Sequence, residues 1–510
     1  HSESAHPWVS CHFGTEGHLG LPPNFRNLPY LAVSDIGSCH FWLLPKSFAI
    51  FLAGSENNGH PRKAAAMERE ALASLQKWAD SSHRKPLVVR GARQVGKTWL
   101  VNEFGQKTFA SVAHVVFLNN EVMQGLFAGS LEPARLLTAI GAYTNTNPLD
   151  GNTLVFLDEI QECPRAIASL KTLCEQMPQV PIIAAGSLLG VALNRQKEEV
   201  EGRISWPVGK VDYLDLYPMT FREFLRALGE DQLADLIRPD SLDIISALGE
   251  KYEDLLRIYL FTGGMPEAVQ KYVDTRLLAE VRHIQSNLLR DFEYDFSKHV
   301  DSPLETEHIR ELWRSVPTQI SRETGSKKFV YSKVRQGGRG RDYKDAISWL
   351  VDAGLIIRVN KVSKPGIPLK TYEVDQSFKL FMLDVGLLGA ALGLDEQTVV
   401  SGNRLFTLGK GVYAEQFVCE QLCAAGSIPR YWAADGKQSK GEVDFLYESE
   451  GQVVPVEVKA NDNVKSRSIA DFSKTYGIDR CLRLSLRGYI DQGWLVNIPL
   501  YAANILPLAL

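Results

Sequence analysis

Three short apolar segments, separated by helical patterns, indicate a parallel β-sheet in the first half of the chain. Leu87–Arg90 predicts a short buried strand directly after Pro86. Thr153–Leu157 is a continuous apolar run, typical of a strand that is covered on both faces, and Pro181–Ala185 is a third such run. A helical pattern at Trp99–Phe104 follows the first strand. We therefore expect an α/β fold with a doubly wound parallel sheet.

The middle of the chain changes to helical periodicity. Residues 226–290 show the spacing of amphipathic helices, interrupted at Gly263-Gly264 and Pro266. In an α/β fold of this kind, we expect such a segment to form a helical lid that closes over a ligand bound at the ends of the strands.

From Pro303 onward the pattern predicts two helices and then two strands. The helices are Thr306–Ile320 and Asp342–Ala353, and the second ends at Gly354. The strands are Leu355–Val359 and Lys370–Val374, joined by a loop rich in proline and glycine. Helix, turn and helix followed by a two-stranded wing predict a winged-helix domain.

The last 110 residues favour a second α/β unit. A helix is predicted from Gly411 through Leu422, and two alternating strands are predicted at Gly441–Leu446 and Val453–Lys459. Alternation places Glu457 and Lys459 on one face of the second strand.

Composition supports a globular chain and says little about its chemistry. The 510 residues include 45% hydrophobic and 23% charged side chains, with a formal net charge of −4. This length suggests three or four domains of roughly 100–200 residues each, and the composition excludes a disordered chain, a fibrous repeat and a disulfide-dense miniprotein. The 7 cysteines fit a reduced, cytoplasmic protein. No apolar run reaches the length of about 18 residues that a membrane span needs.

Residues 1–66 differ from the rest of the chain. The first 60 residues carry only six charged side chains, and the first methionine is Met67. Cys11-His12 and Cys39-His40 lack the short pair spacing of structural zinc sites. We expect residues 1–66 to be a fragmentary or non-native extension without a function of its own.

A glycine-rich loop follows the first predicted strand and predicts a nucleotide site. Gly91 to Thr98 matches the Walker A pattern G-x-x-x-x-G-K-[ST] between a strand and a helix. The backbone amides and the helix N-terminus suit phosphate binding, and Lys97 can reach the β/γ-phosphates. The Thr98 hydroxyl can ligate Mg²⁺. The expected nucleotide-binding residues are Gly91, Arg93, Gln94, Val95, Gly96, Lys97, Thr98 and Trp99.

Acidic and polar residues at two further strand ends complete this site. Asp158 ends the second strand and is expected to hold Mg²⁺, and Glu159 is expected to act as the general base on water. Ser187 follows the third strand and is a candidate sensor of the γ-phosphate; simple helix capping is the alternative. Arg203 is a candidate arginine finger, in cis or in trans from another subunit of a homo-oligomer, or an ordinary surface arginine.

The approach to the second helix of the predicted winged helix is strongly basic. Residues 327–344 contain seven positive side chains and one negative, Asp342. Such a segment beside a recognition helix can bind the phosphates of DNA, although a solvated loop on a protein-interaction domain has the same composition. The positive residues are Lys327, Lys328, Lys333, Arg335, Arg339, Arg341 and Lys344.

The C-terminal strands resemble the PD-(D/E)xK nuclease fold. The resemblance implies that Asp444 and Glu457 are metal ligands, that Lys459 positions or activates water, and that Glu415 is an additional helix acid. Two carboxylates and a lysine suit Mg²⁺-assisted phosphodiester hydrolysis. A degenerate domain retained for binding, or a solvated polar face, is the alternative.

Residues 67–510 as a whole resemble one family of bacterial and archaeal AAA-type ATPases that carry a C-terminal domain of unknown function. The resemblance rests on the segments 86–98, 155–161, 263–269 and 378–388 and on the stretch around Glu457-Val-Lys459. It implies ATP and Mg²⁺ as ligands and lends no established biological role. Residues 1–66 fall outside the family pattern.

These observations together predict an extension at 1–66, a P-loop ATPase core at 67–225, a helical lid at 226–300, a winged helix at 301–392 and a PD-(D/E)xK-like domain at 393–510. The expected function is an ATPase that couples nucleotide binding and hydrolysis to a C-terminal module engaging DNA. An ATP-gated, Mg²⁺-dependent nuclease and a nucleotide-dependent protein-interaction switch are the alternatives.

Overall fold

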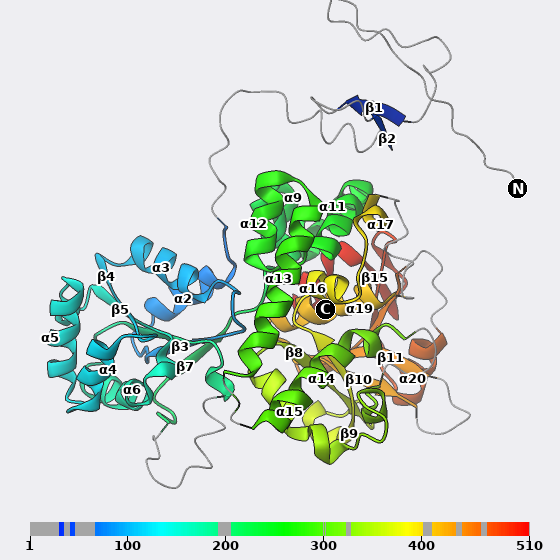
Figure 1. Cartoon of the computed structure of the whole chain (residues 1–510). Coiled ribbons are helices and arrows are strands. Elements are labelled where there is room, and N and C mark those ends of the chain that lie inside the picture. The colour runs from blue at the N-terminus through cyan, green and yellow to red at the C-terminus, as the bar shows by residue number, and fades with distance from the viewer. Residues whose placement is uncertain are drawn as a thin grey trace, which may run out of the picture. The chain divides into compact units, whose positions relative to one another are not determined.

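The computed structural model of the chain divides into two units, His1–Ala64 and Ala65–Leu510. It describes residues 30–34, 41–45, 67–191, 206–298, 300, 302–322, 328–400, 411–434, 441–460 and 467–508. In the first unit, β1 (Tyr30–Ser34) and β2 (Phe41–Pro45) pair as an antiparallel hairpin. Cys11-His12, Cys39-His40, Arg203 and Lys327 lie outside the described residues. The elements of the second unit are labelled in Figure 1.

The first part of the second unit is built on a five-stranded parallel sheet. Its strands are β3 (Leu87–Arg90), β4 (Ser111–Val116), β5 (Thr153–Asp158), β6 (Ile182–Ala185) and β7 (Asp212–Asp215). They lie in the order β4-β5-β6-β3-β7, and all neighbouring pairs are parallel. Three of these strands are the ones predicted from the apolar runs.

Both faces of this sheet are covered by helices, which confirms the expected α/β architecture. In β5, Leu154 and Phe156 belong to one hydrophobic cluster, and Val155 and Leu157 belong to another. The first cluster includes α2 (Ala71–Ala79) and α3 (Lys97–Thr108); the second includes α4 (Glu121–Ala128), α5 (Pro133–Thr144) and α6 (Pro164–Gln176) (Figure 1). Successive side chains of a strand point to opposite faces of the sheet. Because both faces are covered here, every position of β5 is buried, which explains the continuous apolar run in the sequence.

The loops that follow β3, β5 and β6 lie at one edge of the sheet because the strands are parallel. β3 lies between β6 and β7, so the chain crosses over it on the way from β6 to β7. Ligands bind α/β sheets outside the carboxyl ends of the strands, at such a crossover. The sheet therefore places the Walker A loop, Asp158 and Ser187 at the same edge.

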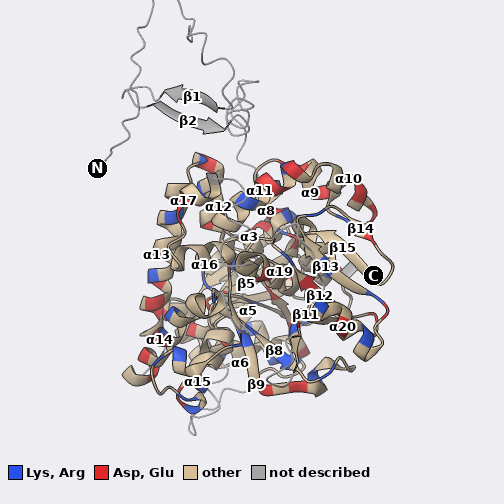
Figure 2. Cartoon of the chain, turned by 90° about the vertical axis from the view of Figure 1, so that its right-hand side faces the viewer, with Lys and Arg blue, Asp and Glu red and all other residues tan. Residues whose placement is uncertain are grey.

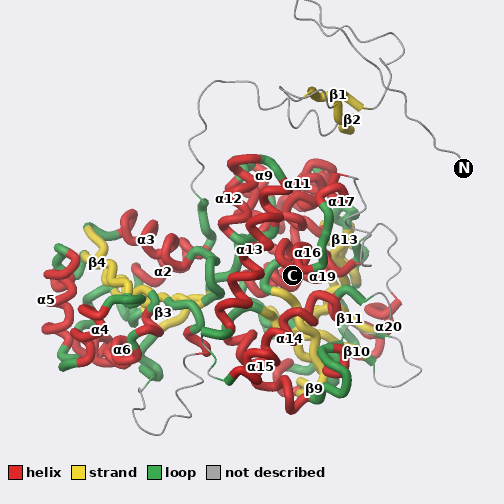
Figure 3. The backbone as a smooth tube through the Cα atoms, in the orientation of Figure 1, coloured by secondary structure: helices red, strands yellow, loops and turns green. Residues whose placement is uncertain are grey.

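The predicted lid consists of helices in the part of the chain that the structure describes (Figure 3). Its bounds are α8 (Phe221–Ala227), α9 (Asp231–Leu236), α10 (Leu242–Ala247), α11 (Gly249–Thr262), α12 (Pro266–Thr275) and α13 (Leu278–Phe296). The predicted break lies between α11 and α12. There the amide of Met219 donates to the carbonyl oxygen of Gly264 at 2.7 Å, and a Cβ on Gly264 would lie 2.1 Å from the Met219 oxygen.

The next segment contains the two predicted helices, α14 (Pro303–Ile320) and α15 (Gly340–Asp352). Two antiparallel strands follow, β8 (Ile356–Val362) and β9 (Glu373–Met382). The second strand begins later and runs further than predicted, because Leu369–Tyr372 forms a short 3-10 helix.

β8 and β9 belong to the same sheet as the C-terminal strands. The eight strands lie in the order β14-β15-β13-β12-β11-β10-β8-β9, and β8 pairs in parallel with β10. The sheet thus crosses residue 392, where the sequence suggested a domain boundary. Its remaining strands are β10 (Arg430–Ala433), β11 (Glu442–Ser449), β12 (Gln452–Val458), β13 (Cys481–Ser485), β14 (Ile490–Asp491) and β15 (Leu495–Pro499).

Helices pack on both faces of the eight-stranded sheet. Ile469 and Phe472 of α20 (Arg467–Tyr476) pack against Val443 and Leu446 of β11. The bounds of the other helical elements are α16 (Val385–Ala391), α17 (Glu396–Val400), α19 (Val412–Ala424) and η8 (Leu500–Leu508).

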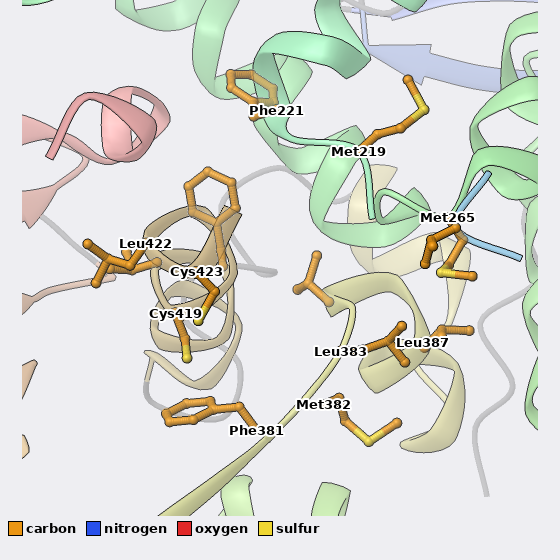
Figure 4. Close-up of a cluster of buried hydrophobic side chains, with 14 of the residues drawn as sticks. Met219, Phe221, Met265, Phe381, Met382, Leu383, Leu387, Cys419, Leu422 and Cys423 are labelled. Carbon is orange, nitrogen blue, oxygen red and sulfur yellow. The ribbon is translucent and has the colours of Figure 1, made fainter. Parts of the chain in front are cut away.

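A continuous hydrophobic core joins the C-terminal sheet to the ATPase sheet and the lid. Figure 4 shows Phe221 of α8 beside the helix α19, which carries Cys419, Leu422 and Cys423. The rings of Phe221 and Phe417 lie 6.3 Å apart in an edge-to-face arrangement, and the Phe221 amide donates to Gln421 Oε1 at 3.3 Å. The ATPase part and the C-terminal part are therefore one packed unit.

Among the residues that the structure describes, no helix combines the length and the apolar character that crossing a bilayer requires.

Candidate nucleotide site and carboxylate cluster

Two glycines give the Walker A loop its path. Gly91 has φ +148°, and a Cβ there would lie 2.2 Å from the carbonyl oxygen of Leu216, so a side chain would clash with the chain after β7. Gly96 has φ +93° and stands directly before α3. Both conformations favour glycine, and together they place the α3 N-terminus at the sheet edge, where its free amides can bind phosphate.

Lys97 is the first residue of α3 and is buried. Its ammonium donates to the carbonyl oxygens of Gly91 at 2.9 Å and Ala92 at 2.8 Å. Burial lowers the pKa of Lys97 to about 8, although the charges of Glu159 and Asp158 act in the opposite direction. The ammonium is thus held inside the loop where the phosphates of a nucleotide would lie.

Thr98 and Asp158 meet across the sheet edge, as the sequence predicts for a Mg²⁺ site. The Thr98 hydroxyl donates to Asp158 Oδ2 at 2.8 Å. The amide of Glu159 donates to Asp158 Oδ1 at 3.0 Å, and His114 Nε2 lies 3.4 Å from Asp158 Oδ2. A hydroxyl beside a carboxylate is the donor set that hard divalent cations prefer, so these residues fit Mg²⁺ bound together with nucleotide phosphates.

Glu159 is held in an uncommon conformation by two polar side chains. Its φ is +50°, in the left-handed region where non-glycine residues are strained. Its Oε2 accepts hydrogen bonds from Ser187 Oγ at 3.1 Å and from the Gln161 amide. Arg93 Nε donates to the same Ser187 hydroxyl at 3.3 Å. A polar chain from Arg93 through Ser187 therefore fixes the carboxylate that is predicted to act on water.

The partner of Arg93 was not predicted from the sequence. Arg93 forms an ion pair with Asp295 at the end of α13, with 2.7 Å between Nη1 and Oδ1. A cavity of about 570 Å³ lies beside this pair. This ion pair connects the loop that would bind phosphate to the last lid helix. The two residues are just over 200 positions apart in the sequence, so no local pattern indicates the contact.

Arg69 is a second residue that sequence reasoning missed. It is buried, forms an ion pair with Glu223 of α8 at 3.1 Å, and donates to the carbonyl oxygens of Val95 at 2.8 Å and Tyr217 at 2.6 Å. Val95 belongs to the Walker A loop. Arg69 therefore supports this loop from behind, and no local motif around it signals that role.

The C-terminal part touches the Walker A loop directly. Gly354, at the turn between α15 and β8, has φ +72°, and a Cβ there would lie 3.1 Å from the amide nitrogen of Ala92. A Cβ on Gly190, three residues after Ser187, would lie 2.7 Å from the carbonyl oxygen of Asp352. The C-terminal end of α15 is thus in contact with two loops of the nucleotide site.

Within the described part of the basic segment, five positive side chains are exposed. They belong to Lys333, Arg335, Arg339, Arg341 and Lys344. Acidic side chains lie nearby: Arg335 is 3.9 Å from Glu311, and Figure 2 shows both signs of charge on α14 and α15.

The four residues of the predicted nuclease-like site come together in the structure. Lys459 Nζ lies 2.9 Å from Glu457 Oε1, and the Val458 amide donates to Asp444 Oδ2 at 2.8 Å. Burial raises the pKa of Asp444 to about 7, and the nearby charge of Glu415 acts in the same direction. We call Glu415, Glu442, Asp444, Glu457, Lys379 and Lys459 the carboxylate cluster.

Lys379 is the member of this cluster that the sequence did not indicate. It lies on β9 and is buried, and its Nζ lies 2.6 Å from Glu442 Oε1 and 3.8 Å from Glu415 Oε2. A single lysine inside the apolar run Phe378–Met382 was the available signal.

The carboxylate cluster does not fit a divalent cation in this arrangement. In the described part of the chain, no three histidine, cysteine, aspartate or glutamate side chains converge in a metal-binding geometry. At the cluster, a buried ammonium stands between Glu415 and Glu442.

Comparison with known families agrees with the nucleotide site. Residues 83–225 match the family described as "AAA domain", which supports an AAA-type ATPase. Two further matches carry no functional description: residues 253–398 match "Domain of unknown function (DUF8612)", and residues 410–502 match "Domain of unknown function (DUF4143)". No curated protein matches the chain.

Three solved structures show distant similarity to the chain. The Walker-type ATPase PABY2304 of Pyrococcus abyssi is 14% identical, with a TM-score of 0.41, covering 66% of this chain and 99% of that chain. The Aeropyrum pernix ORC1 protein in complex with DNA is 12% identical, with a TM-score of 0.27 and coverages of 66% and 95%. A RuvB variant from Thermotoga maritima is 14% identical, with a TM-score of 0.25 and coverages of 57% and 86%. These TM-scores are too low to assign a fold or a function.

Proposed function

We propose that this protein is a cytoplasmic, ATP-hydrolysing AAA-type ATPase that couples its nucleotide state to a C-terminal module engaging DNA. The observation that supports ATP hydrolysis most strongly is the contact of Thr98 with Asp158 at 2.8 Å, beside the Glu159 carboxylate fixed by Ser187. The match of residues 83–225 to an AAA domain supports the same conclusion.

Phosphate binding, cation binding and proton transfer are assigned to different residues of the site. Lys97 and the amides at the α3 N-terminus would bind the phosphates, and Thr98 and Asp158 would hold Mg²⁺. The cation would neutralise charge on the phosphates. Glu159 accepts a proton from the attacking water, and Ser187 keeps the carboxylate oriented toward that water. Ser187 is the proposed sensor of the γ-phosphate, and Arg93, which donates to the Ser187 hydroxyl, would touch the phosphates.

An ATPase assay on the full chain tests this part of the proposal. Lys97→Ala should abolish ATP binding and turnover, because the buried ammonium is the main positive charge inside the loop. Lys107→Ala is the matched control: Lys107 lies on the same helix and pairs with Glu103 on the surface. Turnover that survives Lys97→Ala would refute the assigned site.

Helix α15 supports coupling between the ATPase and the C-terminal module. Its C-terminal end contacts the Walker A loop at Ala92 and the loop after Ser187. Its N-terminal end, at Gly340, lies within the basic segment of residues 327–344. A change at the nucleotide site can therefore reach the basic residues through one helix.

The DNA-binding proposal rests on the exposed positive side chains at the start of α15. The double variant Lys333→Glu/Arg335→Glu should weaken duplex DNA binding and flatten its salt dependence by roughly two units of log–log slope. Lys77→Glu/Lys107→Glu is the matched control, because it makes the same charge change on exposed lysines of α2 and α3. Equal effects of the two variants, or no binding by the unmodified chain near 50 mM salt, would remove this claim.

A Mg²⁺-dependent nuclease gated by ATP is the second candidate. The PD-(D/E)xK resemblance implies it, and Glu415, Asp444, Glu457 and Lys459 lie together as that resemblance requires. For this candidate to hold, Mg²⁺ would have to displace the Lys379 ammonium from Glu415 and Glu442. Plasmid cleavage with Mg²⁺, lost in Asp444→Ala and Lys459→Ala while ATP turnover remains, would establish it. A trans role for Arg203 would in addition require a homo-oligomer.

A further inference from the structure

The carboxylate cluster contains a buried cation that belongs to the chain itself. Lys379 is 1% exposed. Its Nζ lies 2.6 Å from Glu442 and 3.8 Å from Glu415, so a single ammonium bridges a residue of β11 and a residue of α19. An isolated charge in such a place would be strongly unfavourable, and the two carboxylates provide the compensation it needs.

The Lys379–Glu442 pair joins two strands that are not neighbours in the sheet. β8 and β10 lie between β9 and β11 in the sheet. The ammonium lies 4.9 Å from the centre of the Tyr431 ring on β10, within the range of a cation–π contact. Four partners in the core therefore hold one end of this lysine: two carboxylates, a ring and, at longer range, Asp444.

The ammonium keeps its proton at neutral pH. The ordinary pKa of lysine is about 10.4, and the carboxylates of Glu442 and Glu415 beside the ammonium stabilise its charged form. A protonated amine has no lone pair to offer a metal ion. Lys379 can therefore oppose a divalent cation at this point but cannot ligate one.

We propose that Lys379 takes the place of the divalent cation, so that the C-terminal module closes its carboxylate cluster with an internal ammonium. A divalent cation such as Mg²⁺ needs several oxygen ligands at about 2.0–2.1 Å in near-octahedral geometry. Here Glu442 and Glu415 face Lys379, Glu457 faces Lys459, and Asp444 accepts an amide hydrogen bond. Each of these acidic side chains interacts with a donor of the protein, and their oxygens do not converge on one point.

This assignment goes beyond the proposed function and chooses between its two candidates. The module retains the acidic residues of a nuclease-like site, and they hold β9 and β11 to α19. Metal-assisted cleavage is not available to it. The inference does not depend on DNA binding, which involves the basic residues near α15.

Binding of Mn²⁺ to the nucleotide-free full chain tests the inference. Free Mn²⁺ is followed by electron paramagnetic resonance in the unmodified chain and in Asp444→Asn, Lys379→Met and Lys379→Met/Asp444→Asn. The Walker site is the same in all four proteins, so differences between them report on the cluster. Lys459→Met is the matched control, because it removes the other lysine of the cluster, which is 31% exposed.

We expect the unmodified chain and Asp444→Asn to bind Mn²⁺ identically. Lys379→Met should bind one additional equivalent of Mn²⁺ at the carboxylate cluster. The Kd of this site should be at least tenfold lower than that of any Mn²⁺ bound at the cluster of the unmodified chain. The added Asp444→Asn change should remove that equivalent, and Lys459→Met should gain less. A Mn²⁺ equivalent in the unmodified chain that Asp444→Asn removes would overturn the inference, and this comparison stands even if Lys379→Met does not fold. A folded Lys379→Met protein without any gain would overturn it as well.

Discussion

Removal of Arg69 should destabilise the protein and weaken ATP binding together. The Arg69 and Glu223 side chains are 4% and 3% exposed, so the change to methionine leaves a buried carboxylate without its cationic partner. Breaking a buried ion pair in this way costs about 3–5 kcal/mol. Glu223 keeps hydrogen bonds from the amides of Thr220 and Glu70, at 2.8 and 2.6 Å, which favours the lower end, about 3 kcal/mol.

The effect on ATP arises because the Val95 carbonyl loses its hydrogen bond from Arg69. The Walker A loop then lacks its support from behind, and we expect the Kd for a fluorescent ATP analogue to rise at least tenfold. Unfolding by urea, followed by tryptophan fluorescence, measures the stability change. The double variant Arg69→Met/Glu223→Gln should recover part of the lost stability, because it leaves no unpaired buried charge.

Arg226→Met is the matched control. Arg226 lies on the same helix as Glu223, and its ion-pair partners Glu68 and Asp235 are 58% and 64% exposed. Exposed pairs contribute about 0–1 kcal/mol. The reasoning is refuted if Arg69→Met loses no more stability than Arg226→Met, or if it loses stability while ATP affinity is unchanged.

Three further predictions concern the nucleotide site. The pKa of Lys97 is lowered to about 8 in the nucleotide-free protein, so its ammonium is charged below that pH. Calorimetry should therefore show ATP affinity falling as pH rises through 8, by at most tenfold per pH unit. An ATP affinity that stays constant to pH 9.5 would contradict this prediction. Glu159→Gln should retain ATP binding and lower kcat by at least about 100-fold, as measured by phosphate release; unchanged kcat would exclude Glu159 as the base. Gly354→Ala should weaken ATP binding, because its Cβ would lie 3.1 Å from the Ala92 amide. Gly337→Ala is the control, because Gly337 also has a positive φ but has open space around it. Equal losses of ATP affinity in the two variants would argue against the contact.

The arrangement of the proposed nucleotide site could be predicted from the sequence because its elements are local. The strand, loop and helix around Lys97 form one continuous segment, and Asp158 and Ser187 each end an apolar run. Parallel strands bring such ends to the same edge whatever the details of packing.

Arg69, Asp295 and Lys379 could not be predicted in the same way. Arg69 and Glu223 are 154 positions apart in the sequence, and the pairing of Lys379 with Glu442 depends on the order of four strands. The start of β9 was misplaced because Leu369–Tyr372 has strand-like composition but forms a short helix. Its membership in the larger sheet follows from the parallel pairing of β8 with β10, which no local pattern specifies.

The position of β8 has a consequence for the order in which the chain can fold during synthesis. β8 is bonded to β9 on one side and to β10 on the other, and β10 begins only at Arg430. When the chain has been synthesised only to residue 392, the backbone donors and acceptors on one side of β8 therefore have no partner strand. Such an open strand edge is a template for pairing with other chains. The C-terminal part is thus expected to remain prone to aggregation until its last strands have emerged, and a chain shortened at that point should not yield a soluble domain.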